Sequence, residues 1–372
     1  MKEKNRQFLL LQAVAIILVL IGHKGSVCLA TITHYLPIHA YHMALFIFIS
    51  GYFFSLDSLN NVQQYINKKV KHLLIPYFVY NLIYGVIVFI LKKNNIITYG
   101  WDLNLRTFFL EPWIRGHQYI FNLAMWFVLS LFLTQLTYLF FRRLCKKIKF
   151  TNEFLMLVFL LIIGMLTLKA IQTFETNNEF LKYTCARTLF FLPFFHFGFY
   201  YKNILEKKDN LNTFIYFAIL IAIIEQMKLL GVPIDYGSVF MDFHGNIFIP
   251  YIAAFTGILL WLRITKILAK YIGKFKVVEW IGSSTWDIMA HHLFVFFLIN
   301  FAFYLSNYHG FNKQEFHNSI WYTFTPGSKY QTYIYYALAI AIPVGIHYLL
   351  VKIKKTDFKK FTKSKKNCNF AP

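Results

Sequence analysis

Two apolar stretches near the start of the chain each carry a histidine: AVAIILVLIGH (residues 13–23) and YHMALFIFISGYFF (residues 41–54). Neither shows the alternation typical of barrel strands, and in lipid only a helix satisfies the backbone of such a segment. An ionisable side chain in a membrane helix is costly and marks a functional site by default. Imidazole titrates near neutral pH, which suits proton transfer. The two stretches therefore predict a membrane protein with chemistry near His23 and His42.

The apolar character extends over all 372 residues. The hydrophobic share is 58% and the mean hydropathy is +0.49, whereas soluble domains are about 45–50% apolar. Runs near the length of a transmembrane helix recur from end to end. We predict an all-α, polytopic membrane helix bundle, with one integral membrane domain at residues 1–351 and a basic cytoplasmic tail at 352–372. The predicted transmembrane helices, about ten, are residues 7–23, 36–55, 73–91, 118–141, 154–170, 185–201, 211–230, 247–262, 281–304 and 331–351.

Lysine and arginine indicate the orientation of these helices. With the N-terminus in the cytoplasm, every cytoplasmic segment is basic, and together these segments hold most of the 38 lysines and arginines, as the positive-inside rule requires. We therefore predict an N-in, C-in, multi-pass protein of the cell (cytoplasmic) membrane. The net charge of +22 then needs no nucleic acid as partner, because the basic residues are scattered over short loops. No small-residue cleavage site follows the basic start, so we expect the first helix to be retained.

The sequence lacks familiar catalytic and metal-binding motifs. It contains no Gly-x-Ser-x-Gly elbow, no P-loop and no His-Glu-x-x-His segment. Its four cysteines form no CxxC pair and no metal-like spacing, so we expect neither a disulfide framework nor a metal site. The cysteines are Cys28, Cys145, Cys185 and Cys368.

The two longest outer segments are rich in aromatic residues. Residues 92–117 hold Trp101 and Trp113, and residues 305–330 hold Trp321. Such side chains could stack on sugar rings. The alternative is an aromatic belt at the membrane interface, which most membrane proteins have.

The order of the first two spans predicts that their histidines are neighbours. His23 falls at the outer end of the first span, and His42 falls about two turns into the second from the outer side. The connecting loop is short, so the two helices are expected to pack antiparallel. Both imidazoles could then face one cavity in the outer half of the membrane. The alternative is that each histidine only hydrogen-bonds a neighbouring helix.

Five segments resemble, in the same order, those of the membrane acyltransferase 3 family, whose multipass enzymes O-acylate extracellular or periplasmic glycans. LVLIGH (18–23) resembles the family's first helix, and YHMALFIFISGYF (41–53) the second helix of its fucose 4-O-acetylase-like branch. KKVKHLLIPY (68–77) resembles the basic start of the third helix, and MWFVL (125–129) part of the fourth. STWDIMAH (284–291) resembles a late helix that runs from serine to histidine. Apolar helices look alike, so the order and spacing carry the resemblance.

The resemblance implies roles for residues of the first, second and fourth helices. His23 would be the general base on an acceptor hydroxyl, or would carry the acyl group transiently. His42 would position or polarise the substrate, and Trp126 would line the substrate cavity. Gln12 stands where the family usually has arginine or lysine, eleven residues before the histidine. Since Gln12 has no charge, either another cation replaces the missing one, for example Arg6 or a cytoplasmic lysine, or this member is inactive.

A basic patch at the start of the third span is the expected donor site. Lys68, Lys69, Lys71 and His72 lie together at a cytoplasmic helix start. Cationic side chains and free backbone N–H groups at such a point can hold phosphates, and acetyl-coenzyme A (acetyl-CoA) is a phosphorylated cytoplasmic acyl donor. The alternative is an ordinary positive-inside flank.

A second polar cluster, formed by Asp287, His291 and His292, lies in the ninth span. Asp287 and His291 are four residues apart, so they would share a helix face. The carboxylate could orient the imidazole and raise its basicity, and we assign both residues to the substrate cavity together with Gln12 and Trp126. The alternative is a polar contact between helices.

These observations predict a membrane O-acyltransferase. It would move an acyl group, most simply acetyl, from acetyl-CoA to a hydroxyl of a cell-surface polysaccharide or its lipid-linked precursor. Its partners would be that glycan, membrane lipids and other proteins of polysaccharide synthesis. Two alternatives stay open: a glycan or lipid transporter or flippase without chemistry, and an inactive accessory subunit of polysaccharide synthesis.

Overall fold

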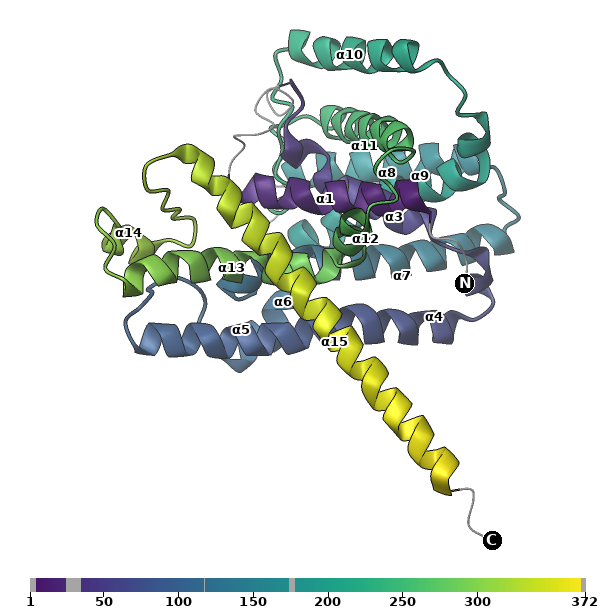
Figure 1. Ribbon diagram of the computed structural model, residues 1–372. Coiled ribbons are helices and arrows are strands. Elements are labelled where there is room, and N and C mark those ends of the chain that lie inside the picture. The colour runs from purple at the N-terminus through teal and green to yellow at the C-terminus, as the bar shows by residue number, and fades with distance from the viewer. Residues whose placement is uncertain (1–4, 25–34, 117, 174–177, 369–372) are drawn as a thin grey trace.

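The described part of the chain is helical. The computed structural model describes residues 5–24, 35–116, 118–173 and 178–368, except for the side chains of Lys24, Lys329 and the residues beyond Lys352. Within these ranges the only extended pairing is one isolated bridge between Gly237 and Asp242. Most helices run side by side, and α15 (Thr332–Cys368) crosses them obliquely (Figure 1). The predicted all-α bundle is thus confirmed, while Cys28 and the last four residues of the predicted tail lie outside the described residues.

Seven of the described helices are long and apolar enough to cross a membrane. Further helical turns lengthen two of them. The helix α4 (Val62–Lys69) and the π-helical η3 (Val70–Leu74) lead into α5, and η5 (Ile120–Met125), which is kinked at Asn122, leads into α7. The seven are α1 (Arg6–Lys24), α5 (Ile75–Lys93), α7 (Trp126–Lys147), α8 (Glu153–Thr173), α11 (Ile249–Leu268), α13 (Thr285–Leu305) and α15.

The other three predicted spans form shorter apolar helices. These are α3 (His42–Tyr52), α9 (Ala186–Tyr200) and α10 (Thr213–Leu229). With 11 residues, α3 is only about 16 Å long and reaches across about half of a hydrocarbon core of about 30 Å. The helical segment that contains α9 is longer than α9 itself. Two π-helical segments continue it, η6 (Phe180–Cys185) before α9 and η7 (Tyr201–Leu205) after it.

The short helix α3 packs directly against the backbone of α9. At Gly51 an added Cβ atom would overlap the carbonyl oxygen of Phe195, and at Gly198 it would overlap that of Phe48. The two glycines therefore let the helix backbones meet without a side chain between them, as small residues do in membrane bundles. This contact holds α3 inside the bundle, where ten of its eleven residues are buried.

Buried charges next to α9 are paired. The Arg142 guanidinium lies 2.6 Å from the Glu153 carboxylate. The pair leaves neither buried charge uncompensated, which would be costly away from water. His196 donates from Nε2 to the carbonyl oxygen of Glu153 at 2.9 Å, so its Nδ1 accepts from the Tyr138 hydroxyl, also at 2.9 Å. A second group at the same end joins Arg263 and Lys266 to Asp209. These groups join neighbouring helices and have a structural role.

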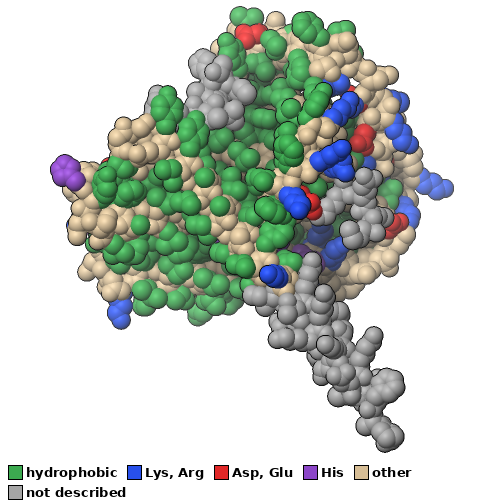
Figure 2. Space-filling view, viewed as in Figure 1, with side chains coloured by type: hydrophobic (Ala, Val, Ile, Leu, Met, Phe, Trp, Pro, Cys, Tyr) green, Lys and Arg blue, Asp and Glu red, His purple; other side chains and the backbone are tan. Residues whose placement is uncertain are grey.

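Surface charge is distributed unevenly along the bundle. In Figure 1, α1 starts and α15 runs out toward the end at which α4 lies. On the face in Figure 2, lysine and arginine side chains gather toward that end, and apolar side chains cover most of the remainder. Both ends of the described chain thus lie toward the end of the bundle at which the basic side chains of this face gather.

The contact between α3 and α9 generates a stability prediction. We expect Gly51→Ala and Gly198→Ala each to lower the stability of the detergent-solubilised protein by about 1–3 kcal/mol, because the new methyl group forces two backbones apart. Gly345→Ala in α15 is the control, because a Cβ atom there meets nothing within 4 Å. Thermal unfolding followed by monodispersity on gel filtration measures the effect. Wild-type midpoints for both core variants would contradict the proposed packing.

Candidate active site

Two cavities lie end to end along α1 and α3. The first has a volume of about 570 Å³, and we call it the lysine cavity because Lys68 and Lys69 line it. The second has a volume of about 310 Å³, and we call it the histidine cavity because His23 and His42 line it. Along α1, Gln12 lines the first and His23 the second, a rise of about 16 Å.

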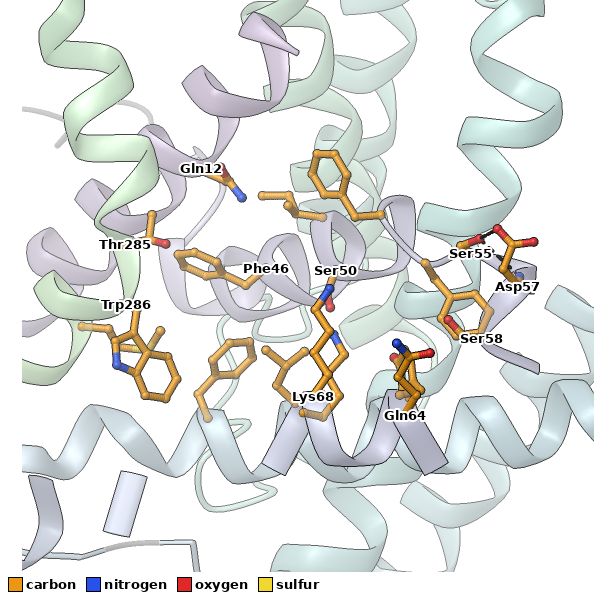
Figure 3. Close-up of a pocket in the computed structure, with 18 of the residues that line it drawn as sticks. Gln12, Phe46, Ser50, Ser55, Asp57, Ser58, Gln64, Lys68, Thr285 and Trp286 are labelled. Carbon is orange, nitrogen blue, oxygen red and sulfur yellow. Dashed lines mark hydrogen bonds between the residues drawn. The ribbon is translucent and has the colours of Figure 1, made fainter. Parts of the chain in front are cut away.

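Residues of five helices, α1, α3, α4, α7 and α13, and of the segment between α3 and α4 form the lysine cavity (Figure 3). Gln12 reaches it from α1, Ser50 and Phe46 from α3, and Lys68 from α4, while Trp286 closes one side from α13. The remaining lining residues are Ile49, Phe53, Phe54, Ser55, Asp57, Ser58, Asn61, Gln64, Tyr65, Lys69, Phe127, Leu131, Thr285 and Met289.

The predicted basic patch divides between this cavity and the surface. The Lys68 side chain extends toward Ser50 in Figure 3, and the Lys69 ammonium lies over the Tyr65 ring, 5.1 Å from its centroid. Lys71 and His72 are exposed and do not contribute to the lining. The lining residues at α4, Asn61, Gln64, Tyr65, Lys68 and Lys69, follow one helix face and stop at Lys69, so the cavity ends before it reaches His72 one turn further on.

The histidine cavity brings the two predicted histidines together. His42 is buried and its Nδ1 lies 2.8 Å from the carbonyl oxygen of Ile38. Since a carbonyl only accepts, Nδ1 carries the proton and Nε2 of the neutral ring has the lone pair. The imidazole of His39 packs edge-on against His42, with ring centroids 5.4 Å apart, and also lines the cavity.

His23 contacts two rings from distant parts of the sequence. At its edge, Nδ1 lies 3.2 Å from Nε2 of His292. The Trp321 ring stacks parallel to the His23 ring, with centroids 5.9 Å apart and planes 5° apart. The position of the first-helix histidine thus depends on α13 and on the loop after α14 (Lys313–Asn318).

A loop between α10 and α11 covers the histidine cavity. Its residues 235–240 line the cavity, as does His244. Burial, together with the carboxylate of Asp235, raises the pKa of the Tyr236 phenol above its ordinary value, so this hydroxyl stays protonated. Sequence reasoning missed the loop, because nothing in its composition indicates that it folds back over the bundle.

One buried arginine holds this loop in place. Arg187 is 1% exposed, and its guanidinium lies over the Trp126 ring, 4.6 Å from the centroid. It donates to the carbonyl oxygens of Ser238, at 3.2 Å, and Val239. The NH1 group also donates to the carbonyl oxygen of Arg115 at 3.2 Å. Trp126 in turn lines the histidine cavity, so Arg187 joins the covering loop to a cavity wall.

Asp287 and His291 lie outside the lining of both cavities. They do not form the hydrogen-bonded pair that their spacing suggests. Asp287 accepts instead from Nδ1 of His347 on α15 at 2.8 Å, and Nδ1 of His291 lies 2.6 Å from the Tyr84 hydroxyl on α5. The adjacent residue His292 faces α1 and reaches His23. The predicted residue, His291, and the residue that contacts His23, His292, are thus adjacent on α13 but point to different sides of the helix.

A third cavity, of about 390 Å³, adjoins the histidine cavity and shares Val239 and Phe240 with it. We call it the aromatic groove, because Trp101, Trp321 and Tyr183 line it together with polar Arg115 and Gln118. Trp113 does not line it and packs against Phe78.

Met289 of α13 lines both the lysine cavity and the histidine cavity. Its side chain is a shared wall between a space with cationic side chains and a space with imidazoles. In the described part of the chain, no three histidine, cysteine or acidic side chains converge in a way that could hold a metal ion.

Comparison with known proteins places this arrangement in a family. Residues 6–352 match the Acyl_transf_3 family model, described as an acyltransferase domain. No curated protein and no solved structure matches the chain. The family match extends over nearly all of the chain and includes every residue that lines the two cavities. The chain therefore belongs to the acyltransferase 3 family and is a multi-pass membrane acyltransferase.

Proposed function

We propose that the protein transfers an acyl group, most simply acetyl, from acyl-CoA in the lysine cavity to a glycan hydroxyl in the histidine cavity. The acceptor would be a cell-surface polysaccharide or its lipid-linked precursor, and the enzyme would act in the cytoplasmic membrane. The observation that carries the proposal is the shared wall at Met289. A donor held by cations and an acceptor held near imidazoles can meet only where their cavities adjoin.

The lysine cavity suits the donor. Lys68 and Lys69 offer positive charge to the phosphates of acetyl-CoA, and the apolar wall formed by Phe46, Phe127 and Met289 suits its uncharged thioester arm. Gln12, which replaces the family's usual cation, lines this same cavity. The two lysines supply positive charge on the facing wall, which supports an active enzyme over an inactive accessory subunit.

The histidine cavity suits the transfer. His23 would take the proton of the acceptor hydroxyl, whose oxygen attacks the thioester carbonyl and forms the ester as the carbon–sulfur bond breaks. The coenzyme A thiolate leaves and takes up the proton. The lone pair on Nε2 of His42 would accept a hydrogen bond from the acceptor and position it. In a second route, the nitrogen of His23 that would act as the base attacks the thioester carbon first, and His23 carries the acyl group transiently.

The aromatic groove suits a sugar acceptor. Its tryptophans, Trp101 and Trp321, present flat apolar surfaces beside the polar groups of Arg115 and Gln118, a combination that matches the faces and hydroxyl edges of a sugar ring. Trp321 also stacks on His23, so a sugar bound there lies next to the base. The resemblance of residues 41–53 to the fucose 4-O-acetylase-like branch supports the same substrate class. Proteins of polysaccharide synthesis are the proposed partners.

The first test is transfer of labelled acetyl from acetyl-CoA to a candidate glycan by the purified protein. We expect His23→Ala and His42→Ala to lower the rate by about 100-fold or more, since general acid–base groups contribute about 10²–10⁴-fold. His309→Ala is the control, because His309 is exposed and lies outside both cavities. Wild-type rates in both cavity variants would remove these residues from the mechanism. Glycan movement without consumption of acetyl-CoA would identify a transporter.

The division of the basic patch gives a second test. We expect Lys68→Ala/Lys69→Ala to raise the KM for acetyl-CoA about tenfold, the loss that follows removal of charged hydrogen bonds, with a smaller effect on kcat. Lys71→Ala is the matched control, because Lys71 is exposed and lines neither cavity. Steady-state kinetics with varied acetyl-CoA measure the difference. Equal effects of the pair and the control would indicate a general influence of charge rather than a donor site.

The shared wall at Met289 gives a third test. Met289→Trp places a larger side chain between the two cavities, and we expect kcat to fall about tenfold or more because the reacting groups can no longer approach. Met289→Leu, which nearly conserves the volume, should keep activity within about threefold. Binding of acetyl-CoA, measured by calorimetry, should persist in both variants. Full activity of Met289→Trp would refute transfer across this wall.

A further inference from the structure

We propose that His292 is a positioning residue that fixes the tautomer of His23, so that Nε2 of His23 is the reacting nitrogen. The inference rests on the proposed function of His23, and it adds a residue for which the sequence provided no role. The contacts that carry it form a chain from the backbone of α13, through two imidazoles, to the histidine cavity.

The first step is the proton on His292. Its Nδ1 lies 2.9 Å from the carbonyl oxygen of Ile288 and 3.0 Å from that of Met289. Because carbonyl oxygens only accept, Nδ1 of His292 carries a proton. The ring is 0% exposed, and none of the described residues brings a carboxylate into hydrogen-bond contact with it. Burying an imidazolium under these conditions is costly, so the neutral ring, with its lone pair on Nε2, is the form that fits.

The second step transfers this constraint to His23. Nε2 of His292 lies 3.2 Å from Nδ1 of His23. Since Nε2 of His292 can only accept, Nδ1 of His23 must donate, and the lone pair of the neutral His23 ring is then on Nε2. Which nitrogen of a histidine is protonated is set by the hydrogen bond that the other one makes. The backbone of α13 thus determines the protonation of a side chain on α1.

Aromatic contacts hold both rings in the orientation that this chain needs. The Phe296 ring packs edge-on against His292, with centroids 5.7 Å apart and planes 83° apart. The Trp321 ring, which stacks parallel to the His23 ring, restrains His23. With Nδ1 of His23 directed to His292, the second nitrogen serves the cavity that His23 lines.

The consequence for the reaction is direct. A base must present a lone pair to the hydroxyl proton, and an acyl carrier must present one to the thioester carbon. In the other tautomer Nε2 of His23 would carry a hydrogen and could do neither, just as a serine protease loses most of its activity when its histidine has the wrong tautomer. His292 therefore acts through His23 and need not touch the substrate.

A graded series of variants at position 292 tests the inference by activity. The amide oxygen of His292→Gln can reach the place of Nε2 and accept from His23, whereas the shorter His292→Asn and the apolar His292→Leu cannot. We expect kcat to fall about 10–100-fold in the Asn and Leu variants, the range that metal enzymes show when a residue that orients a ligating histidine is lost. The KM for acetyl-CoA should stay within about twofold, and the Gln variant should recover most of the loss. Wild-type kcat in His292→Leu would overturn the proposal.

The tautomer can also be observed without activity. Solid-state NMR of wild-type protein with ¹⁵N-labelled histidine, compared with His23→Asn, isolates the signals of His23. We expect a protonated Nδ1 and an unprotonated Nε2, and a protonated Nε2 in the wild type would overturn the inference. Because this spectrum needs neither catalysis nor a folded variant at position 292, it also separates the two proposals. A wild type without acyl transfer but with the expected spectrum would contradict the function and leave the geometry standing.

Discussion

The structure depends on the direct backbone contact between α3 and α9 at Gly51 and Gly198. This contact seats an 11-residue helix inside the bundle, although α3 alone is too short to cross a membrane. Its two ends then serve two cavities, with His42 in one and Ser50 in the other. A larger residue at either glycine would move α3 outward and change both cavities together. The packing of two glycines is therefore a condition for the proposed meeting of donor and acceptor.

Polar groups inside the bundle are arranged in two ways. At the end near α4, the charges of Arg142 and Glu153 compensate each other directly and hold helices together. Near the histidine cavity, the buried guanidinium of Arg187 is satisfied by backbone carbonyls and by the face of Trp126. An arginine bound to carbonyls holds the loop closed without a carboxylate as its own partner. The charge environment of the proposed base thus differs from that of the structural helix contacts.

Part of the candidate site could be predicted from residues and their order. The apolar segments that hold His23 and His42, the short loop between them and the basic start of the third span all indicated side chains that line the two cavities. Lys71, His72, Asp287 and His291 were assigned by proximity in sequence, and none of them lines either cavity. The first cavity ends before it reaches His72, and on α13 successive residues point to different sides of the helix, so neighbours in sequence do not share one site. Met289 carried no signal, and His292 was noted only as a member of the polar cluster without a role of its own, because both roles depend on which face of α13 meets α1 and α3.

The sequence by itself determined that the chain forms helices, where most of them lie, and which end carries the basic residues. These properties follow from local composition, since an apolar segment in lipid must satisfy its own backbone. Only the tertiary structure decided the depth of α3, the rotation of α13 that brings His292 to His23, and the closure of residues 235–240 by Arg187. Each of these rests on contacts between residues far apart in the chain. Such contacts depend on shape and on hydrogen-bond geometry, and these cannot be predicted from the composition of apolar helices that resemble one another.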